Sequence, residues 1–378
     1  MKKTVALLMA LLLMLSVIVS CTSPDKGADG ADKNDDKDKN NENSDNSDNT
    51  DDEKMEDENK IDYKTTMDIY FVVGQSNAAG NTAIRDIPGI KSLDSALSTG
   101  TGFSNVHFSG NSWATPNTRM SWRKTTYGLG INSNCIGPEL GIAHSLSKYY
   151  NADTGRHAGI IKFAQGNTHL LNQTYAGAND YGNWVSPSYA AAIGANYSDT
   201  AITGGLYRKF LDQIKESINT LEAYSGHTKI NLVGLYWMQG ENDRVNPIEY
   251  QRAIQYFVSD LRKDISDIML EFTNGESDCG AADLPMLIGT ISRTCGITNA
   301  DTELMVNTPF VLMQKKLPET IENCYIVDNS NYKIGSWNPN TNKVNVVGND
   351  VWHWNQRDMV AIGQNVGNMF LDEIVKKK

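Results

Sequence analysis

Short apolar runs alternate along this chain with longer segments whose apolar residues repeat at a helical period. The runs are rich in Val, Ile, Leu, Phe and Tyr, as strands are when helices cover both faces of a parallel sheet. The alternation therefore predicts an α/β fold with a central, mostly parallel five-stranded sheet. The expected strands are 67–73, 159–164, 230–237, 284–291 and 324–328.

Helices are expected between and after these strands, at 138–150, 205–223, 247–264, 302–316 and 357–376. Pro138 and Pro247 stand where the first turn of a helix would begin, a position that tolerates a missing amide hydrogen. The segments 80–135 and 166–200 are rich in Gly, Asn, Ser, Thr and aromatic residues. We expect them to be loops that form the walls of a binding cleft.

The first 21 residues have the pattern of an export signal, with Lys2 and Lys3 before an apolar run over 5–19. The run is too short for a durable membrane span. Ile18-Val19-Ser20-Cys21 resembles a bacterial lipobox, which implies cleavage before Cys21 and a lipid on its sulfur. The expected location is therefore lipid-anchored, on the bacterial cell surface or outside the cell. A plain secretory signal that is cleaved nearby is the alternative.

Residues 22–60 contain hardly an apolar side chain, so they cannot bury enough surface to offset the entropy of ordering. We expect a solvated, disordered tether followed by one globular domain over 61–378. The tether holds 15 acidic and 6 basic residues and carries −9 of the total charge of −11. Because the globular part is not basic, nucleic acid is excluded as a partner.

Four cysteines follow Cys21, namely Cys135, Cys279, Cys295 and Cys324. In an exported protein an even number permits two disulfides, with three connectivities that the sequence does not distinguish. Unpaired buried thiols are the alternative. No pair has the C-x-x-C spacing of a zinc site, and no cofactor is expected.

A serine follows the first predicted strand directly, in Gly74-Gln75-Ser76-Asn77. A serine hydroxyl becomes a nucleophile when a histidine takes its proton and a carboxylate orients that histidine. Of the six histidines, only His353 has a carboxylate three positions before it, Asp350. We therefore predict a catalytic triad of Ser76, His353 and Asp350. Taken alone, Asp-x-x-His is more often a surface turn.

Acyl transfer also needs hydrogen-bond donors for the oxygen that becomes negative. The candidate oxyanion donors are the backbone amides of Ser76 and Gly137 and a side-chain amide, from Gln239 or Asn242. Each has a plainer reading as well. Gly137 suits a turn before Pro138, and Gln239 suits a hydrogen bond at a strand end.

Polar turns follow three predicted strands, at 74–77, 165–167 and 239–243. Ligands of open α/β sheets bind at the carboxyl ends of the strands, so one convergent site is expected. The candidate substrate contacts are Gln75, Asn77, Gln165, Asn167, Glu241, Asn242 and Trp352. Glu241 and Asp243 would also suit a glycosidase pair, although a structural role for Glu241 is favoured. His169 lies on a strand-end loop and could line the cleft, but it has no carboxylate nearby in sequence, so we expect it to be merely solvated.

The combination of these motifs resembles the SGNH hydrolase superfamily, in its sialate O-acetylesterase and acetylxylan esterase branch, which includes carbohydrate esterase family 6. The motifs are Gly74-Gln75-Ser76-Asn77, Gly137-Pro138-Glu139, Lys162-x-x-Gln165-Gly166, Trp237-Met238-Gln239-Gly240-Glu241 and Asp350-x-x-His353. The resemblance implies a flavodoxin-like three-layer α/β/α fold and a metal-free deacetylase of carbohydrates. It also implies the same triad and an oxyanion site at Gly137 and Gln239. Ala78 and Gly166-Asn167-Thr168-His169 depart from the expected pattern, which puts sugar preference in doubt.

Two other functions remain open at this stage. A non-catalytic, lipid-anchored carbohydrate-binding protein would use exposed tryptophans to stack on sugars. The candidates are Trp113, Trp122, Trp184, Trp337, Trp352 and Trp354. An esterase acting on peptidoglycan O-acetyl groups is the other, whereas long lipid esters match the polar site poorly.

Overall fold

The computed structural model describes residues 64–112, 115–173, 182–197, 202–296, 300–332, 334, 336–338, 343–345 and 350–377. They belong to one compact unit, Asn59–Lys378. The expected signal peptide with Cys21 and the expected tether lie outside the described residues. Within the described part, no helix combines the length and apolar character needed to cross a membrane.

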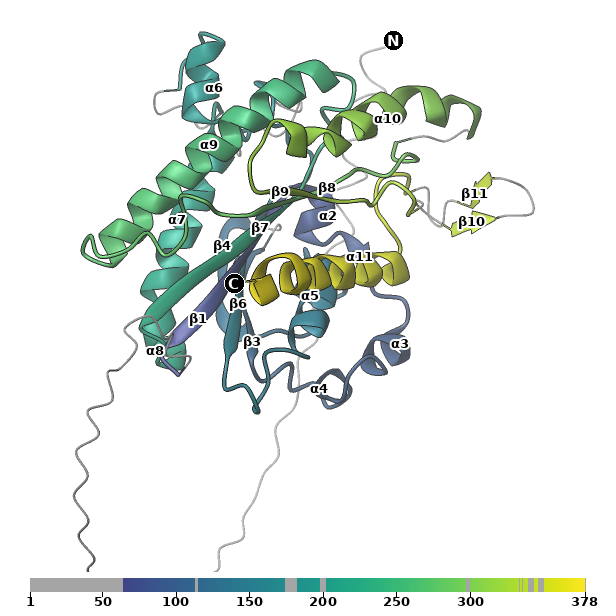
Figure 1. Ribbon diagram of the computed structural model, residues 1–378. Helices are drawn as coiled ribbons and strands as arrows, with labels where there is room; N and C mark the ends of the chain where they lie inside the picture. Colours follow the sequence, from purple (N-terminus) through teal and green to yellow (C-terminus); the bar gives the residue numbers. More distant parts are fainter. Residues whose placement is uncertain are drawn as a thin grey trace, which may run out of the picture. The chain divides into compact units, whose positions relative to one another are not determined.

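A mostly parallel sheet forms the middle layer of this unit (Figure 1). Its order is β4-β3-β6-β1-β7-β8-β9, and only β3 and β4 pair antiparallel. All five predicted strands are present, as β1 (Thr66–Gly74), β6 (His157–Ala164), β7 (Lys229–Met238), β8 (Met286–Gly289) and β9 (Cys324–Val327). The fold class is therefore confirmed, and β1 lies in the centre between β6 and β7.

The sheet has seven strands rather than the predicted five. β3 (Val106–Ser112) and β4 (Thr115–Lys124) extend one edge, within a segment expected to be loop. Both are poor in aliphatic residues, although β3 pairs parallel with β6 and only β4 is an antiparallel edge strand. The segment also holds β2 (Thr82–Ala83), α3 (Ile87–Lys91), α4 (Ser95–Ser98) and β5 (Cys135–Ile136), and α6 (Pro187–Ala192) lies in the other expected loop.

Helices cover both faces of the sheet (Figure 1). Phe71 of β1 meets Phe210 of α7 (Gly205–Asn219) at 5.8 Å between ring centroids. The neighbouring residue Tyr70 contacts an element on the other face of the sheet. Its ring centroid lies 5.0 Å from that of Phe370, in η3 (Phe370–Ile374). The remaining elements are α5 (Pro138–Leu146), α8 (Leu221–Ser225), α9 (Pro247–Phe272), α10 (Ala300–Lys315), η1 (Leu317–Glu319), β10 (Ser336–Asn338), β11 (Lys343–Asn345), α11 (Gln356–Met369), η3 (Phe370–Ile374) and η4 (Val375–Lys377). The predicted three layers are present.

Two glycines let α5 and α11 pack very closely. A Cβ atom on Gly141 would lie 2.2 Å from the Val360 carbonyl oxygen, and one on Gly363 would lie 2.3 Å from the Pro138 oxygen. α5 begins just after Gly137, and α11 begins three residues after His353. The close packing therefore brings two of the predicted site segments to the same region.

Three of the six tryptophans expected to stack on sugars are packed in the interior. Trp122, Trp184 and Trp354 are buried, and only Trp352 of the described tryptophan side chains is partly exposed. Trp113 and the side chain of Trp337 lie outside the described part. The interpretation as a tryptophan-based binding protein therefore loses half of its six candidate residues.

All four globular cysteines, Cys135, Cys279, Cys295 and Cys324, are free thiols. Burial raises the pKa of Cys324 to about 12, and that of Cys135 also lies above its ordinary value. Thiols held protonated in this way are poor nucleophiles. The alternative of unpaired, mostly buried thiols describes this structure.

Candidate active site

Ser76 begins the short helix α2 (Ser76–Ala79), directly after the central strand β1 (Figure 1). The chain turns at Gly74, whose φ of 148° is one that only glycine adopts readily. A Cβ atom there would lie 2.1 Å from the Met238 carbonyl oxygen, so the turn requires glycine. The Ser76 side chain remains partly exposed at the carboxyl edge of the sheet.

Asp350 and His353 form a hydrogen-bonded pair. Asp350 Oδ2 lies 2.8 Å from His353 Nδ1, and Oδ1 accepts the backbone amides of Trp352 and His353 at 2.9 and 3.1 Å. Burial acts to raise the pKa of Asp350, but these hydrogen bonds outweigh it and hold the pKa below its ordinary value. An ionised Asp350 places the imidazole proton on Nδ1, which leaves Nε2 as the proton acceptor.

The serine turn and the histidine segment meet, although 272 residues separate Asn81 from His353. The Asn77 side-chain amide donates to the Trp352 carbonyl oxygen at 3.2 Å. The Asn81 amide nitrogen lies 3.1 Å from His353 Nε2 and 3.4 Å from Nδ1. A group almost equidistant from both nitrogens lies over the ring face, so it leaves the in-plane lone pair of Nε2 free.

Within the described residues, no hydrogen bond joins the Ser76 hydroxyl to His353. Catalytic hydrogen bonds are often long without substrate and tighten when it binds. The structure therefore brings the serine turn and the histidine segment together, and the contact and proton transfer between Ser76 and His353 stay predictions.

Two of the three expected oxyanion donors are already engaged. The Gly137 amide donates to Glu139 Oε1 at 2.8 Å. The Gln239 side chain is 1% exposed, and its amide donates to Thr168 and Asp243 at 3.0 and 2.7 Å. In this structure neither amide is free to meet a substrate oxygen, which differs from the expectation. The Ser76 amide, at the first position of α2, keeps its place as a candidate donor.

The seven expected substrate contacts fall into two groups. Gln75, Asn77, Gln165 and Glu241 are at most 2% exposed, so they support the site from within rather than face a ligand. Asn167, Asn242 and Trp352 are exposed or partly exposed at the same edge of the sheet. Only this second group can contact a sugar in this structure.

Glu241 has the structural role that was favoured for it. Its Oε1 accepts the Asn77 amide at 2.7 Å. Burial raises the pKa of Glu241, against the opposing effect of its hydrogen bonds. Asp243 is also buried, so the two carboxylates do not face a cleft as a glycosidase pair would.

A buried ion pair supports the end of the serine helix, and no motif in the sequence predicts this pairing. Lys162 Nζ lies 3.1 Å from Glu139 Oε2 and donates to the carbonyl oxygens of Ala79 and Leu129 at 3.2 and 2.6 Å. Ala79 is the last residue of α2. A lysine in the middle of an otherwise apolar parallel strand was the available signal, because such a charge needs a partner.

His169 has a carboxylate partner, contrary to the expectation that it is merely solvated. Its Nδ1 lies 2.8 Å from Asp243 Oδ1. The partner is 74 residues away in sequence, which is why the local pattern did not reveal it.

Arg244 stacks on Trp352, the residue before His353. The guanidinium carbon lies 4.8 Å from the ring centroid, within the range of a cation–π contact. Nη1 also donates to the Glu241 carbonyl oxygen at 2.5 Å. This contact holds one side of the histidine segment against the turn that follows β7.

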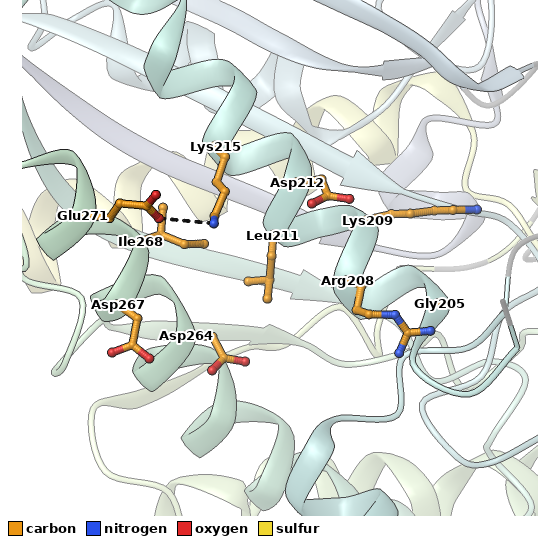
Figure 2. A pocket seen from close by; sticks show the side chains of 10 residues that line it. All are labelled: Gly205, Arg208, Lys209, Leu211, Asp212, Lys215, Asp264, Asp267, Ile268 and Glu271. Carbon is orange, nitrogen blue, oxygen red and sulfur yellow. Dashed lines mark hydrogen bonds and ion pairs between the residues drawn. The ribbon is translucent and has the colours of Figure 1, made fainter. Parts of the chain in front are cut away.

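A groove on the described surface lies apart from this site. It measures about 680 Å³ and lies between α7 and α9 (Figure 2). Its walls carry side chains of both charges, including an ion pair of Lys215 and Glu271 at 3.3 Å. None of the predicted site residues lines it.

Comparison with solved structures finds the same fold. NanS is 13% identical, with 84% of this chain and 100% of that chain covered and a TM-score of 0.50. A protein of Arabidopsis thaliana is 15% identical, covering 81% and 98%, with a TM-score of 0.43. A carbohydrate acetylesterase from Xanthomonas citri is 13% identical, covering 82% and 57%, with a TM-score of 0.42. The likeness to NanS shows the fold alone.

Curated protein sequences gave no match. A family model does match, over residues 66–371, and it is that of the carbohydrate esterases described as sialic acid-specific acetylesterases. The match spans the whole sheet and both parts of the site. The chain therefore belongs to this family, and it is a carbohydrate acetylesterase that removes O-acetyl groups.

Proposed function

We propose that Ser76, His353 and Asp350 are the catalytic triad of this acetylesterase, which works through an acetyl-enzyme. The observation that carries the proposal is that the ionised Asp350 and His353 pair is tied to the serine turn through Asn77 and Asn81. A base that is oriented by a carboxylate and placed beside a partly exposed serine is the arrangement that serine acyl transfer needs.

In the first half-reaction Ser76 Oγ bonds to the acetyl carbonyl carbon, while its proton passes to His353 Nε2. The carbonyl oxygen becomes negative, and the Ser76 amide is the donor assigned to it. When the intermediate collapses, the bond from carbon to the sugar oxygen breaks. His353 gives its proton to that oxygen, which leaves acetyl-Ser76 and a free sugar hydroxyl.

In the second half-reaction water replaces the sugar. His353 takes a proton from the water as its oxygen bonds to the acetyl carbon. The bond to Ser76 Oγ then breaks, the proton returns to Oγ, and acetate leaves. Asp350 stabilises the imidazolium in both steps and keeps its own charge.

The test compares Ser76→Ala with Ser95→Ala, which removes an exposed hydroxyl on α4. We expect Ser76→Ala to lower kcat for 4-nitrophenyl acetate by at least about 10³-fold, as loss of a nucleophile does. Ser95→Ala should keep wild-type activity. Wild-type turnover in Ser76→Ala would end the proposal.

To identify the natural ester, the acetate released from acetylated xylan, O-acetylated sialic acid and O-acetylated peptidoglycan is measured. The proposal expects release from one of the first two. Release from peptidoglycan alone would move the substrate to the cell wall and keep the triad.

We also place the enzyme on the bacterial surface through a lipid on Cys21. The support is the lipobox-like sequence before Cys21 and the long acidic stretch after it. In cells that express the full chain, labelled palmitate should enter the wild-type protein and not Cys21→Ser. Labelling of both proteins would contradict the anchor.

A further inference from the structure

A second pair of histidine and aspartate lies at the same edge of the sheet as the triad. Asp243 accepts the His169 Nδ1, the Leu170 amide and the Gln239 side-chain amide, each at 2.7 to 2.8 Å. A carboxylate with three donors acts as an acceptor only, so Nδ1 carries the imidazole proton. The lone pair of His169 then lies on Nε2.

Nε2 of His169 has no hydrogen-bond partner among the described residues, whereas Asp243 is 1% exposed. The His169 side chain is 12% exposed, and its Nε2 is not among the fully buried side-chain atoms that lack a partner, so solvent reaches this nitrogen. The nearby Asn167 is exposed and has a left-handed conformation, at φ 57°. An oriented acceptor that faces solvent is unusual for a purely structural histidine.

This pair is connected by hydrogen bonds to Gln75, the residue before the proposed nucleophile. The Gln239 amide that donates to Asp243 also lies 3.3 Å from Gln75 Oε1, and Gln75 precedes Ser76. The three segments follow β6, β7 and β1, which are adjacent parallel strands with β1 in the centre. His169 therefore lies on the β6 side of Ser76, at the edge where ligands of such sheets bind.

We propose that His169 is a substrate-binding residue, whose Nε2 accepts a hydrogen bond from a hydroxyl of the acetylated sugar. Asp243 positions the ring for this contact. The inference rests on the proposed function and goes beyond it, because it assigns a sugar contact to a residue outside the triad. His169 also stands where the motif departs from the pattern that the sequence resembles, so the contact would contribute to sugar preference.

The test uses a pair of variants of similar size. His169→Phe fills the space without an acceptor, and His169→Gln keeps an amide oxygen. The first probe is 4-nitrophenyl acetate, which has no sugar hydroxyl. The second is a mono-acetylated sugar, either xylobiose or sialic acid, whichever ester the wild type hydrolyses faster. His169→Ala replaces His169→Phe if the larger ring lowers Tm by more than a few degrees.

We expect His169→Phe to raise KM for the sugar ester about tenfold, the effect of one hydrogen bond, with kcat within about twofold. His169→Gln should recover part of this loss, and both variants should hydrolyse 4-nitrophenyl acetate as the wild type does. The pH profile of kcat should not move, since His169 does not transfer the proton. Equal losses on both esters, or an unchanged KM for the sugar, would overturn the inference.

A binding measurement separates this inference from the proposed function. The deacetylated sugar should inhibit 4-nitrophenyl acetate hydrolysis, with an inhibition constant about tenfold higher in His169→Phe. This readout does not depend on the triad. An active Ser76→Ala would therefore refute the triad alone, whereas an unchanged inhibition constant would refute the role of His169 alone.

Discussion

Asn77 and Glu241 are joined by a buried hydrogen bond of 2.7 Å, across 164 residues of sequence. The same Asn77 amide also donates to the carbonyl oxygen of Trp352. One side chain therefore connects the serine turn after β1, the turn after β7 and the histidine segment. The relative position of Ser76 and His353 depends on this amide.

Replacing Asn77 should consequently affect both catalysis and folding. In Asn77→Ala the tie to Trp352 is lost, and we expect kcat to fall about 10- to 100-fold, since small misplacements of catalytic groups cost that much. Glu241 also loses its donor, which should cost about 1–3 kcal/mol of stability. Steady-state kinetics and urea unfolding measure the two effects.

Asn81→Ala is the matched control for this prediction. It removes an amide that lies over the His353 ring and has no bond to Glu241. We expect a smaller fall in kcat and little change in the urea midpoint. A loss of stability as large as that of Asn77→Ala would contradict the role assigned to Glu241.

The buried pair of Lys162 and Glu139 gives a prediction about stability. Both side chains are at most 1% exposed. Burial lowers the pKa of Lys162, and the charge of Glu139 opposes the shift. Lys162→Met leaves Glu139 as an uncompensated buried carboxylate, which typically costs about 3–5 kcal/mol.

The double variant Lys162→Met with Glu139→Gln tests the cause of that loss. It removes both charges, so we expect it to recover much of the stability. Urea unfolding of the two single variants and the double variant gives the coupling energy. Additive losses would show that the two side chains stabilise the fold independently.

Five of the seven strands could be predicted from the sequence, whereas the β3–β4 hairpin could not. β1, β6 and β7 are covered on both faces, so their apolar runs are nearly continuous and easily recognised. β3 is buried over 106–110, but only Val106 and Phe108 are large and apolar there, and it contains Ser, Gly and Asn, which are also typical of loops. The sequence pattern therefore predicted a loop of the cleft wall where the structure has the β3–β4 hairpin.

In the site, residues of one turn could be predicted and long-range hydrogen bonds could not. Asp350 and His353 are three residues apart, so their contact is visible in the sequence. Gln239 donates to Thr168 and Gln75, which follow other strands and are far away in sequence. The local pattern does not show these acceptors, so Gln239 was expected to face the substrate. A side-chain amide at a strand end has the same local pattern whether it points inward or outward.

A cluster of three histidines at the opposite end of the sheet predicts a loss of stability in mild acid. His107 Nε2 lies 3.0 Å from His157 Nδ1, and the rings of His157 and His227 are 4.7 Å apart. Burial lowers the pKa of His107 to about 4, and the charges of His157, His227 and Lys124 act in the same direction. Burial also lowers the pKa values of His157 and His227.

The unfolded chain binds more protons than the folded one between the lowered pKa values and the ordinary value of 6.5. Stability is therefore complete above about pH 6.5 and falls as the pH drops toward 4, by at most about 3 kcal/mol for His107. Urea unfolding at pH 7.5 and 5 measures the fall. His107→Phe should show a smaller pH dependence, and an unchanged slope would show that other groups cause the loss.

Asp350→Asn should abolish most of the activity while it preserves the fold. The asparagine would present its amide to His353 Nδ1 and favour the tautomer with the proton on Nε2, which cannot accept from Ser76. We expect kcat for 4-nitrophenyl acetate to fall about 10²–10⁴-fold with KM nearly unchanged. Asp153→Asn, at an exposed turn, is the control and should retain full activity.

Because the pKa of Asp350 lies below its ordinary value, its carboxylate stays ionised as the pH falls through the usual range of aspartates. Activity that the wild type loses above pH 4 should therefore come from another group, and if it instead followed the titration of Asp350, the hydrogen-bond geometry described for this pair would be wrong.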